Sequence, residues 1–291
     1  MDFLQPTTWQ EALAIKAERP EALPISGGTD VMVELNFGRS RPEAVLDLTR
    51  VPELSEWAPV DGWLRVGAGV TYTRIIGELG DRLPGLAIAS RTVGSPQIRN
   101  RGTVGGNLGT ASPAGDALPP LLAAQAEVEV ASVAVSRRIP MHAFCLGPKL
   151  SALKSDELIA AFWARPASGP QQFAKVGTRN AMVIGVASFA LELDPVRRRV
   201  GTGIGSAGPT PLVAGEAEGF LERVLTDDDR WTTRAQLPAG VAERFGVLVA
   251  AAARPIDDVR GTADYRRHAL SVIARRTLSW AWAEYQGGEK Q

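Results

Sequence analysis

Hydrophobic positions near the N-terminus change between helical and extended spacing, which predicts a small mixed unit. A helical period over 9–17 predicts a helix, and short apolar runs at 22–26 and 44–48 predict strands. Between those two runs, 31–35 again has helical spacing. This order is that of a βαβ-like unit, and the polar turn Ser26–Asp30, which contains two adjacent glycines, lies at its first junction.

The middle of the chain predicts a second sheet with helices beside it. Alternating runs predict strands at 63–68, 127–131, 133–139 and 158–164. A short helix is expected at 71–79, whereas Arg91–Gly115 has little periodicity and eight glycines or prolines, which predicts a loop. Asp116 follows directly, and we expect it to cap a helix whose first turn tolerates Pro119 and Pro120.

A third unit is expected after the segment Arg165–Gln171, which is rich in Pro, Gly and Ser and is typical of a domain boundary. Beyond it the pattern predicts strands at 183–193 and 198–204 and helices at 212–225, 241–252 and 264–284. Two strands with three helices indicate a compact α+β domain. The predicted division is therefore 1–57, 58–170 and 171–291.

Composition and charge narrow the possible partners and chemistry. Lys plus Arg equals Asp plus Glu at 32 each, so no global field favours nucleic acid or an anionic membrane. No run approaches the roughly 18 apolar residues of a membrane span, and no secretory signal is visible, so we expect a cytoplasmic protein.

The cysteine and histidine inventory excludes several kinds of site. With Cys145 alone the chain forms no internal disulfide and cannot by itself ligate an iron–sulfur cluster. His142 and His268 are the only histidines, which makes a structural zinc site improbable. Apolar neighbours favour an inert, buried thiol at Cys145 over a nucleophile, so the chemistry requires a cofactor or a partner.

The most informative motif is TVGGNLGTASPAGD, from Thr103 to Asp116. It contains four glycines, four hydroxyl or amide side chains and one carboxylate, and very few apolar residues. Paired glycines let backbone N–H groups approach a bound group, and successive N–H groups suit phosphate. The motif predicts a nucleotide-cofactor loop, with a purely structural Ω-loop as the alternative.

The turn Ser26–Asp30 is weak evidence alone, because it lacks the third glycine of the dinucleotide fingerprint. Together with Thr103–Asn107, however, it predicts two loops that converge on one pyrophosphate. A literal G-x-G-x-x-G occurs at 203–208, but prolines follow it where a Rossmann helix needs free N–H donors. We interpret those glycines as a strand end or a close backbone contact.

Three segments resemble the FAD-binding subunits of molybdenum hydroxylases, such as xanthine dehydrogenase and carbon monoxide dehydrogenase. Ile25–Asp30 is similar to the first FAD loop of that family, usually A-G-G-T-D. Thr103–Leu108 and Ala111–Asp116 resemble its T-x-G-G-N-L…A-S-P-x-x-D signature. Pro255–Arg267 is similar to the C-terminal signature I-D-D-x-R-G-S-A-x-Y-R. One departure is Asn36, where family members often carry Lys.

The resemblance implies an α+β, vanillyl-alcohol-oxidase-like (PCMH-type) fold. Two α+β subdomains would hold FAD non-covalently, and a C-terminal domain would pack a three-stranded antiparallel sheet against helices. By the same resemblance, Asp116 would bind ribityl or ribose hydroxyls, Ile159 would lie near the cofactor and Lys175 would approach the flavin ring. The residues implied at the pyrophosphate are Ser26, Gly27, Gly28, Thr29, Asp30, Thr103, Val104, Gly105, Gly106 and Asn107.

The family also implies a division of labour. A large subunit would carry the molybdenum cofactor, a small subunit would carry two [2Fe–2S] clusters, and the complex would be a dimer of heterotrimers. Electrons would reach FAD in this oxidoreductase subunit and leave to NAD⁺, oxygen or a quinone. No catalytic side chain or metal ligand is expected here, because the redox chemistry belongs to the flavin. The alternatives are a self-sufficient flavin oxidase or dehydrogenase and a scaffold that has lost the cofactor.

Overall fold

The computed structural model describes residues 1–287, and its N-terminal unit is the predicted βαβ arrangement with one additional strand. The elements are β1 (Asp2–Leu4), α1 (Trp9–Glu18), β2 (Leu23–Ile25), α2 (Val31–Asn36) and β3 (Ala44–Asp47). β2 and β1 both pair with β3 in parallel, giving the order β1-β3-β2. The three-residue β1 is too short to produce a readable periodicity, which is why the sequence did not predict it.

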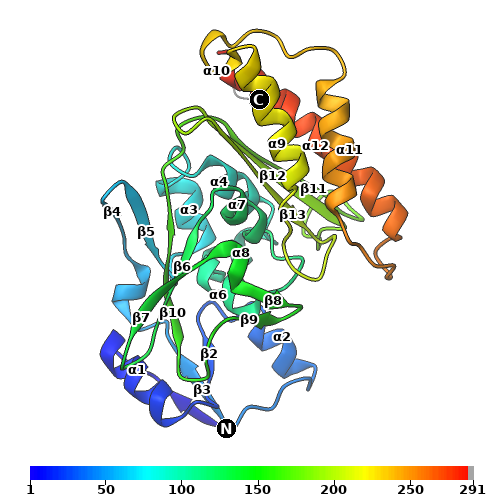
Figure 1. Ribbon diagram of the computed structural model, residues 1–291. Coiled ribbons are helices and arrows are strands. Elements are labelled where there is room, and N and C mark those ends of the chain that lie inside the picture. The colour runs from blue at the N-terminus through cyan, green and yellow to red at the C-terminus, as the bar shows by residue number, and fades with distance from the viewer. Residues whose placement is uncertain (288–291) are drawn as a thin grey trace.

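The second unit is a five-stranded antiparallel sheet with short helices beside it (Figure 1). Its sheet consists of β4 (Trp57–Val60), β5 (Trp63–Gly67), β10 (Leu158–Ala164), β6 (Glu127–Ala131) and β7 (Ser136–Pro140), in that order. The remaining elements are η1 (Pro52–Ser55), α3 (Tyr72–Glu78), α4 (Pro84–Arg91), α5 (Pro96–Arg101), α6 (Val104–Thr110), α7 (Leu118–Ala123), α8 (Met141–Phe144), β8 (Cys145–Gly147) and β9 (Leu150–Ser151). All seven residues of the central strand β10 are buried, so this strand anchors the core.

Two predictions about this unit were wrong. The expected loop at Arg91–Gly115 contains helices α5 and α6, because Ser95 and Thr103 accept hydrogen bonds from the first-turn N–H groups and thereby cap them. Asp116 does not cap the next helix, since the N-cap position of α7 is Ala117 and no side chain bonds there. The prolines of α7 do lie in its first turn, as predicted.

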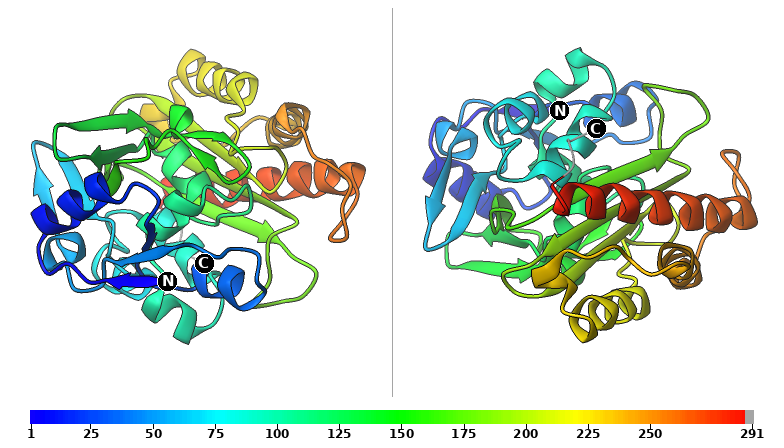
Figure 2. Two further views of the ribbon diagram at one scale, coloured as in Figure 1. Left: turned by 90° about the horizontal axis from the view of Figure 1, so that it is seen from below. Right: turned by 90° about the horizontal axis from the view of Figure 1, so that it is seen from above.

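The C-terminal unit is a three-stranded antiparallel sheet, as the resemblance implied. Its elements are β11 (Gln171–Val176), β12 (Ala187–Asp194), β13 (Arg199–Gly205), α9 (Gly215–Asp227), α10 (Arg230–Thr233), α11 (Val241–Ala252) and α12 (Ala263–Tyr285). The residue pattern alone predicted two strands and missed β11, whose sequence QQFAKV has no regular alternation of polar and apolar residues although every position is buried or half-buried. Helix α12 lies along one face of the sheet, whose other face meets α4 and α7 (Figures 1 and 2).

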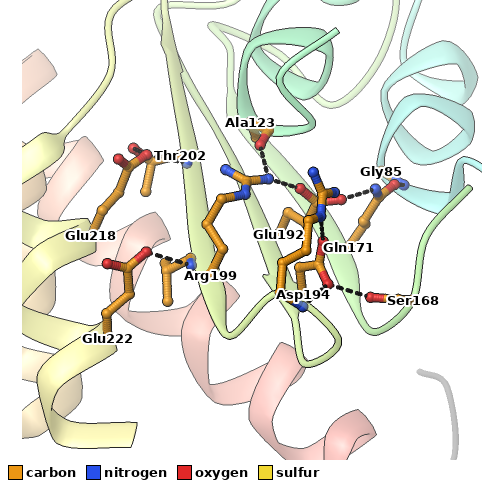
Figure 3. A network of polar contacts seen from close by, with 12 residues as sticks. Gly85, Ala123, Ser168, Gln171, Glu192, Asp194, Arg199, Thr202, Glu218 and Glu222 are labelled. Carbon is orange, nitrogen blue, oxygen red and sulfur yellow. Dashed lines mark hydrogen bonds and ion pairs between the residues drawn. The ribbon is translucent and has the colours of Figure 1, made fainter. Parts of the chain in front are cut away.

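The sheet docks on the helices of the second unit through close backbone contacts and a buried polar network (Figure 3). Gln171 accepts a hydrogen bond from the Gly85 N–H at 3.2 Å and donates to Glu192 at 2.7 Å. Arg199 pairs with Glu192 and donates to the Ala123 carbonyl at 2.9 Å. Burial raises the pKa of Glu192, and the Arg199 charge partly offsets this effect. The contacts fix the C-terminal unit against the rest of the chain.

The glycines at 203–208 take part in this docking, as predicted for a close backbone contact. A Cβ on Gly203 would overlap the Pro119 carbonyl oxygen, and one on Gly201 would overlap the Ala123 carbonyl oxygen. Gly203 and Gly205 lie within β13. The first two glycines of the literal G-x-G-x-x-G therefore pack β13 against Pro119 of α7, whereas Gly208 lies beyond β13 and a Cβ there would meet Leu212.

Candidate functional site

A cavity of about 510 Å³ lies where the N-terminal unit, helix α6 and the start of β10 meet. Eleven of the thirteen residues predicted for the site lie on its wall: Ser26, Gly27, Gly28, Thr29, Asp30, Thr103, Gly105, Gly106, Asn107, Asp116 and Ile159. Val104 is instead fully buried in the adjoining core. Lys175 lines a neighbouring cavity of about 480 Å³ and contacts Asp116 from there.

The first glycine turn connects β2 to α2 and runs along the cavity. Gly28 has a φ of +76°, a conformation that L side chains rarely adopt. A Cβ on Gly27 would overlap the Arg101 carbonyl oxygen, so this glycine allows the turn to approach the end of α5. Asp30 accepts a hydrogen bond from the Thr110 hydroxyl at 3.1 Å, which joins the turn to α6. The two glycine motifs are therefore held side by side.

The second glycine motif is the first turn of α6, and its two glycines have different surroundings. A Cβ on Gly105 would lie within 2.5 Å of the Ala68 Cβ, so Gly105 serves the packing of α6 on the segment after β5. A Cβ on Gly106 would meet only the Thr103 hydroxyl, at 3.2 Å. Both glycines line the cavity, and Gly106 is the one of the pair beside which a side chain would find open space.

The polar groups at the far side of α6 are built from the segment 111–116. Asn107 accepts a hydrogen bond from the Ala117 N–H at 3.3 Å, and Gly115 allows the chain to pass close over the Asn107 amide. The Asp116 carboxylate accepts from Lys175 Nζ at 2.5 Å and from the Thr92 hydroxyl at 3.4 Å. Burial raises the pKa of Asp116, and the Lys175 charge partly offsets the effect.

Lys175 connects three segments around the cavity. Besides Asp116, its ammonium group donates to the Thr92 carbonyl at 3.0 Å and to the Val183 carbonyl at 3.2 Å. The segment 177–185 between β11 and β12, which we call the strap, places Met182, Val183 and Ile184 on the cavity wall. Lys175 therefore holds the strap against the polar end of the cavity.

Tyr72 and the strap belong to the cavity wall and were not predicted from the sequence. Burial, reinforced by the negative charges of Asp116 and Asp30, raises the pKa of the Tyr72 hydroxyl. Tyr72 is the first residue of α3 and has no motif around it, so nothing local in the sequence identifies it. The apolar residues of the strap can be recognised as cavity residues only after β11 and β12 are known, because those strands define where the strap begins and ends.

The remaining candidate groups lie elsewhere. Cys145 is half-buried and not buried as predicted, but burial still raises the pKa of its thiol to about 11, which agrees with the predicted inertness. His142 lies in α8 and His268 in α12, and neither lines the cavity. Among residues 1–287, no group of three or more His, Cys, Asp or Glu side chains is arranged to hold a metal ion. In the same part of the chain, no helix combines the length and apolar character needed to cross a bilayer.

Comparisons with known proteins agree with this architecture. Residues 1–163 match the family described as the FAD binding domain in molybdopterin dehydrogenase. The chain is 30% identical to the nicotine 6-hydroxylase medium subunit of Paenarthrobacter nicotinovorans over 97% of each chain. It is 28% identical to the xanthine dehydrogenase FAD-binding subunit of Escherichia coli O157:H7, over 98% of this chain and 96% of that one.

A solved structure supports the fold. The chain superimposes on quinoline 2-oxidoreductase from Pseudomonas putida 86 with a TM-score of 0.88 at 22% identity, covering 98% of each chain. Together with the observed sheets, this likeness confirms the predicted α+β, PCMH-type fold.

Proposed function

This chain belongs to the FAD-binding medium subunits of the molybdenum hydroxylase family, and from that premise we propose that it is their electron carrier. It is an oxidoreductase subunit whose cofactor is FAD, and the molybdenum and iron–sulfur cofactors belong to partner subunits. In the proposal, electrons arrive from the [2Fe–2S] clusters of a small subunit and leave from FAD to NAD⁺, oxygen or a quinone. A dimer of heterotrimers that works in the cytoplasm is part of the same proposal.

The cavity fits a dinucleotide in shape and in donor chemistry. The observation that carries the proposal is the space beside Gly106, between the Ser26–Asp30 turn and the first turn of α6. We propose that these two backbone segments hold the pyrophosphate of FAD, and that Thr103 and Asn107 assist them. Short polar side chains and first-turn N–H groups are donors that suit phosphate oxygens, and the Gly106 N–H is the one of these that already donates to the Thr103 hydroxyl, at 2.9 Å.

The other end of the cavity suits a flavin ring and its polyhydroxyl chain. We propose that Asp116 binds the ribityl or ribose hydroxyls, because Lys175 and Thr92 both bond to its Oδ2 and its Oδ1 can accept from a ligand in the cavity. Ile159 and the apolar residues of the strap offer a nonpolar wall for the ring, with the Lys175 ammonium group behind them. When bound, the flavin supplies the redox chemistry, and these residues bind and orient it.

The attachment is proposed to be non-covalent. Covalent linkage requires a nucleophilic His, Cys or Tyr at the ring, and neither histidine nor Cys145 lines the cavity. Tyr72 does line it, but the side chain is buried and burial raises the pKa of its hydroxyl, so it stays protonated and is a poor nucleophile. Acid precipitation of the folded protein is therefore expected to release all of its flavin into the supernatant. Flavin that remains with the precipitated polypeptide would contradict this part of the proposal.

Electron transfer is tested with the complex purified together with its partner subunits. The anaerobic complex is reduced with dithionite, and its reoxidation by NAD⁺, oxygen and menadione is followed in the flavin and iron–sulfur absorption bands. FAD-depleted complex, prepared with Gly106→Val, is expected to keep reducible clusters and to lose reoxidation by the natural acceptor. Unchanged reoxidation without flavin, or a folded wild-type chain without flavin, would overturn the proposed function.

A further inference from the structure

The C-terminal signature Pro255–Arg267 lies away from the cavity wall, and its most buried side chain is Arg266. Arg266 is in the first turn of α12, whose N-cap Thr262 accepts from the Tyr265 N–H. Only 3% of Arg266 is exposed, although arginine is rarely buried without partners. The partners of this guanidinium show what the signature does.

The Arg266 guanidinium joins three separate segments. Its Nη1 donates to the Val186 carbonyl at 2.8 Å and to the Ser206 carbonyl at 2.6 Å. Its Nη2 donates to the Asp258 carboxylate at 2.5 Å. The planar guanidinium serves the two carbonyls and the carboxylate with two separate nitrogens, which the single nitrogen of an ammonium group cannot do in this arrangement.

Both carbonyl partners lead directly to the cavity. Val186 is the residue that follows the strap, and its N–H also bonds to the Val176 carbonyl at 2.7 Å, so the strap is closed at its base. Ser206 donates its N–H to the Pro113 carbonyl at 2.8 Å, and Pro113 immediately precedes the cavity residues 114–116. Arg266 and Lys175 therefore link the same two segments. Lys175 bonds directly to the strap and to Asp116, and Arg266 bonds to Val186 and Ser206, which adjoin the strap and segment 113–116.

Asp258 fixes the position of the Arg266 side chain. The Asp258 carboxylate also accepts from the Arg260 N–H at 2.8 Å and from the Arg260 guanidinium at 2.8 Å. Burial alone would raise its pKa, but the Arg260 hydrogen bonds and the charges of both arginines lower the pKa of Asp258 to about 2. The carboxylate therefore stays ionised beside Arg266 over the whole neutral range.

We propose that Arg266 is a positioning residue for the flavin end of the FAD site. It sets the place of the strap relative to segment 113–116 through the Val186 and Ser206 carbonyls. This inference rests on the proposed function, because it assigns the strap end of the cavity to the flavin ring. The hydrogen bonds of Arg266 go to Val186, Ser206 and Asp258 and not to the pyrophosphate segments Ser26–Asp30 and Thr103–Asn107, so we expect the affinity of those segments for their part of the ligand to be unaffected.

The test compares the affinity for FAD with the affinity for ADP, which is the half of FAD that lacks the flavin. FAD and ADP affinities are measured by flavin fluorescence and by competition, on the complete chain, for wild type and Arg266→Lys. Lysine keeps the positive charge, but a single ammonium nitrogen replaces the two guanidinium nitrogens that bond to the two carbonyls and to Asp258. The expected result is a loss of FAD affinity of about tenfold or more, with ADP affinity changed less than about twofold. Arg267→Gln, at the exposed neighbour on the same turn, is the matched control and should leave both affinities unchanged.

A second variant keeps the inference testable if Arg266→Lys fails to fold. Asp258→Asn retains both carbonyl bonds and removes the charged anchor, so a smaller loss confined to FAD is expected. Unchanged FAD affinity in both variants, or equal losses of FAD and ADP affinity, would overturn the positioning role. Wild-type chain that binds neither ligand would instead overturn the proposed function.

Discussion

Two adjacent glycines in α6 give opposite predictions for the same substitution. Both glycines line the cavity, but a Cβ on Gly105 would collide with Ala68, whereas a Cβ on Gly106 would meet only the Thr103 hydroxyl. We therefore expect Gly105→Ala to affect folding and Gly106→Ala to affect cofactor binding. The pair is matched in residue type, helix and chain position, so each variant is a control for the other.

The magnitudes follow from the space around each site. In Gly105→Ala the new methyl group would lie within 2.5 Å of the Ala68 Cβ and closer still to its carbonyl oxygen, so α6 must shift. Overpacking of this kind costs about 1–3 kcal/mol, and the better helix propensity of Ala returns about 1 kcal/mol. In Gly106→Ala the closest atom is at 3.2 Å, and the gain in helix propensity of up to about 1 kcal/mol is retained.

The assay separates the two effects. Urea unfolding without FAD measures stability, and flavin fluorescence measures affinity. Gly105→Ala is expected to lose up to about 2 kcal/mol of unfolding free energy. Gly106→Ala is expected to be at least as stable as wild type and to bind FAD about tenfold or more weakly, because its methyl group occupies cavity space. Wild-type FAD affinity in a folded Gly106→Ala chain would refute the reasoning.

The remaining predictions concern the ion pairs and the docking glycine. Lys175→Met leaves Asp116 buried without its cation and should lower the unfolding free energy by about 3–5 kcal/mol at neutral pH. The folded-state pKa of Asp116 is already above its ordinary 3.8, so this loss should shrink as pH falls towards 3.8, and a loss equal at all pH values would contradict it. For Asp258, the folded-state pKa of about 2 contributes stability that is complete above 3.8 and disappears as pH falls towards 2. Asp258→Asn should remove that acid sensitivity from the unfolding curve, and an unchanged curve would exclude the effect. Gly203→Ala, which forces a methyl group onto the Pro119 carbonyl, should lower the unfolding free energy by about 1–3 kcal/mol and leave FAD affinity unchanged. A selective loss of FAD binding would restore a cofactor role for Gly203.

The parts of the fold that could be predicted are those that a short stretch of sequence determines by its own spacing or composition. The βαβ order of the N-terminal unit follows from apolar spacing, and helix 241–252 matches α11 residue for residue. The two glycine motifs were paired because each is poor in apolar residues, and the Asp30–Thr110 hydrogen bond shows that they are neighbours. Local composition therefore identified the wall of the cavity.

The parts that were missed depend on contacts between distant residues. Glycines in 91–115 indicated a loop, but Gly105 is tolerated in a helix because Ala68, far away in sequence, occupies the space of its Cβ. Lys175 was named through the family resemblance and not from any local pattern, because its three acceptors come from three different segments. Arg266 reaches the strap only across the sheet, so its connection to the cavity was invisible in the sequence.

The central claim is that this chain holds FAD between its two glycine motifs, and the flavin content of the purified chain tests it most directly. The chain is produced with its partner subunits, and its flavin is released with acid, identified by chromatography and compared with the amount of polypeptide. The account predicts equimolar FAD in wild type and a clear deficit in folded Gly106→Ala. A folded wild-type chain without flavin, or equal flavin in both proteins, would contradict it.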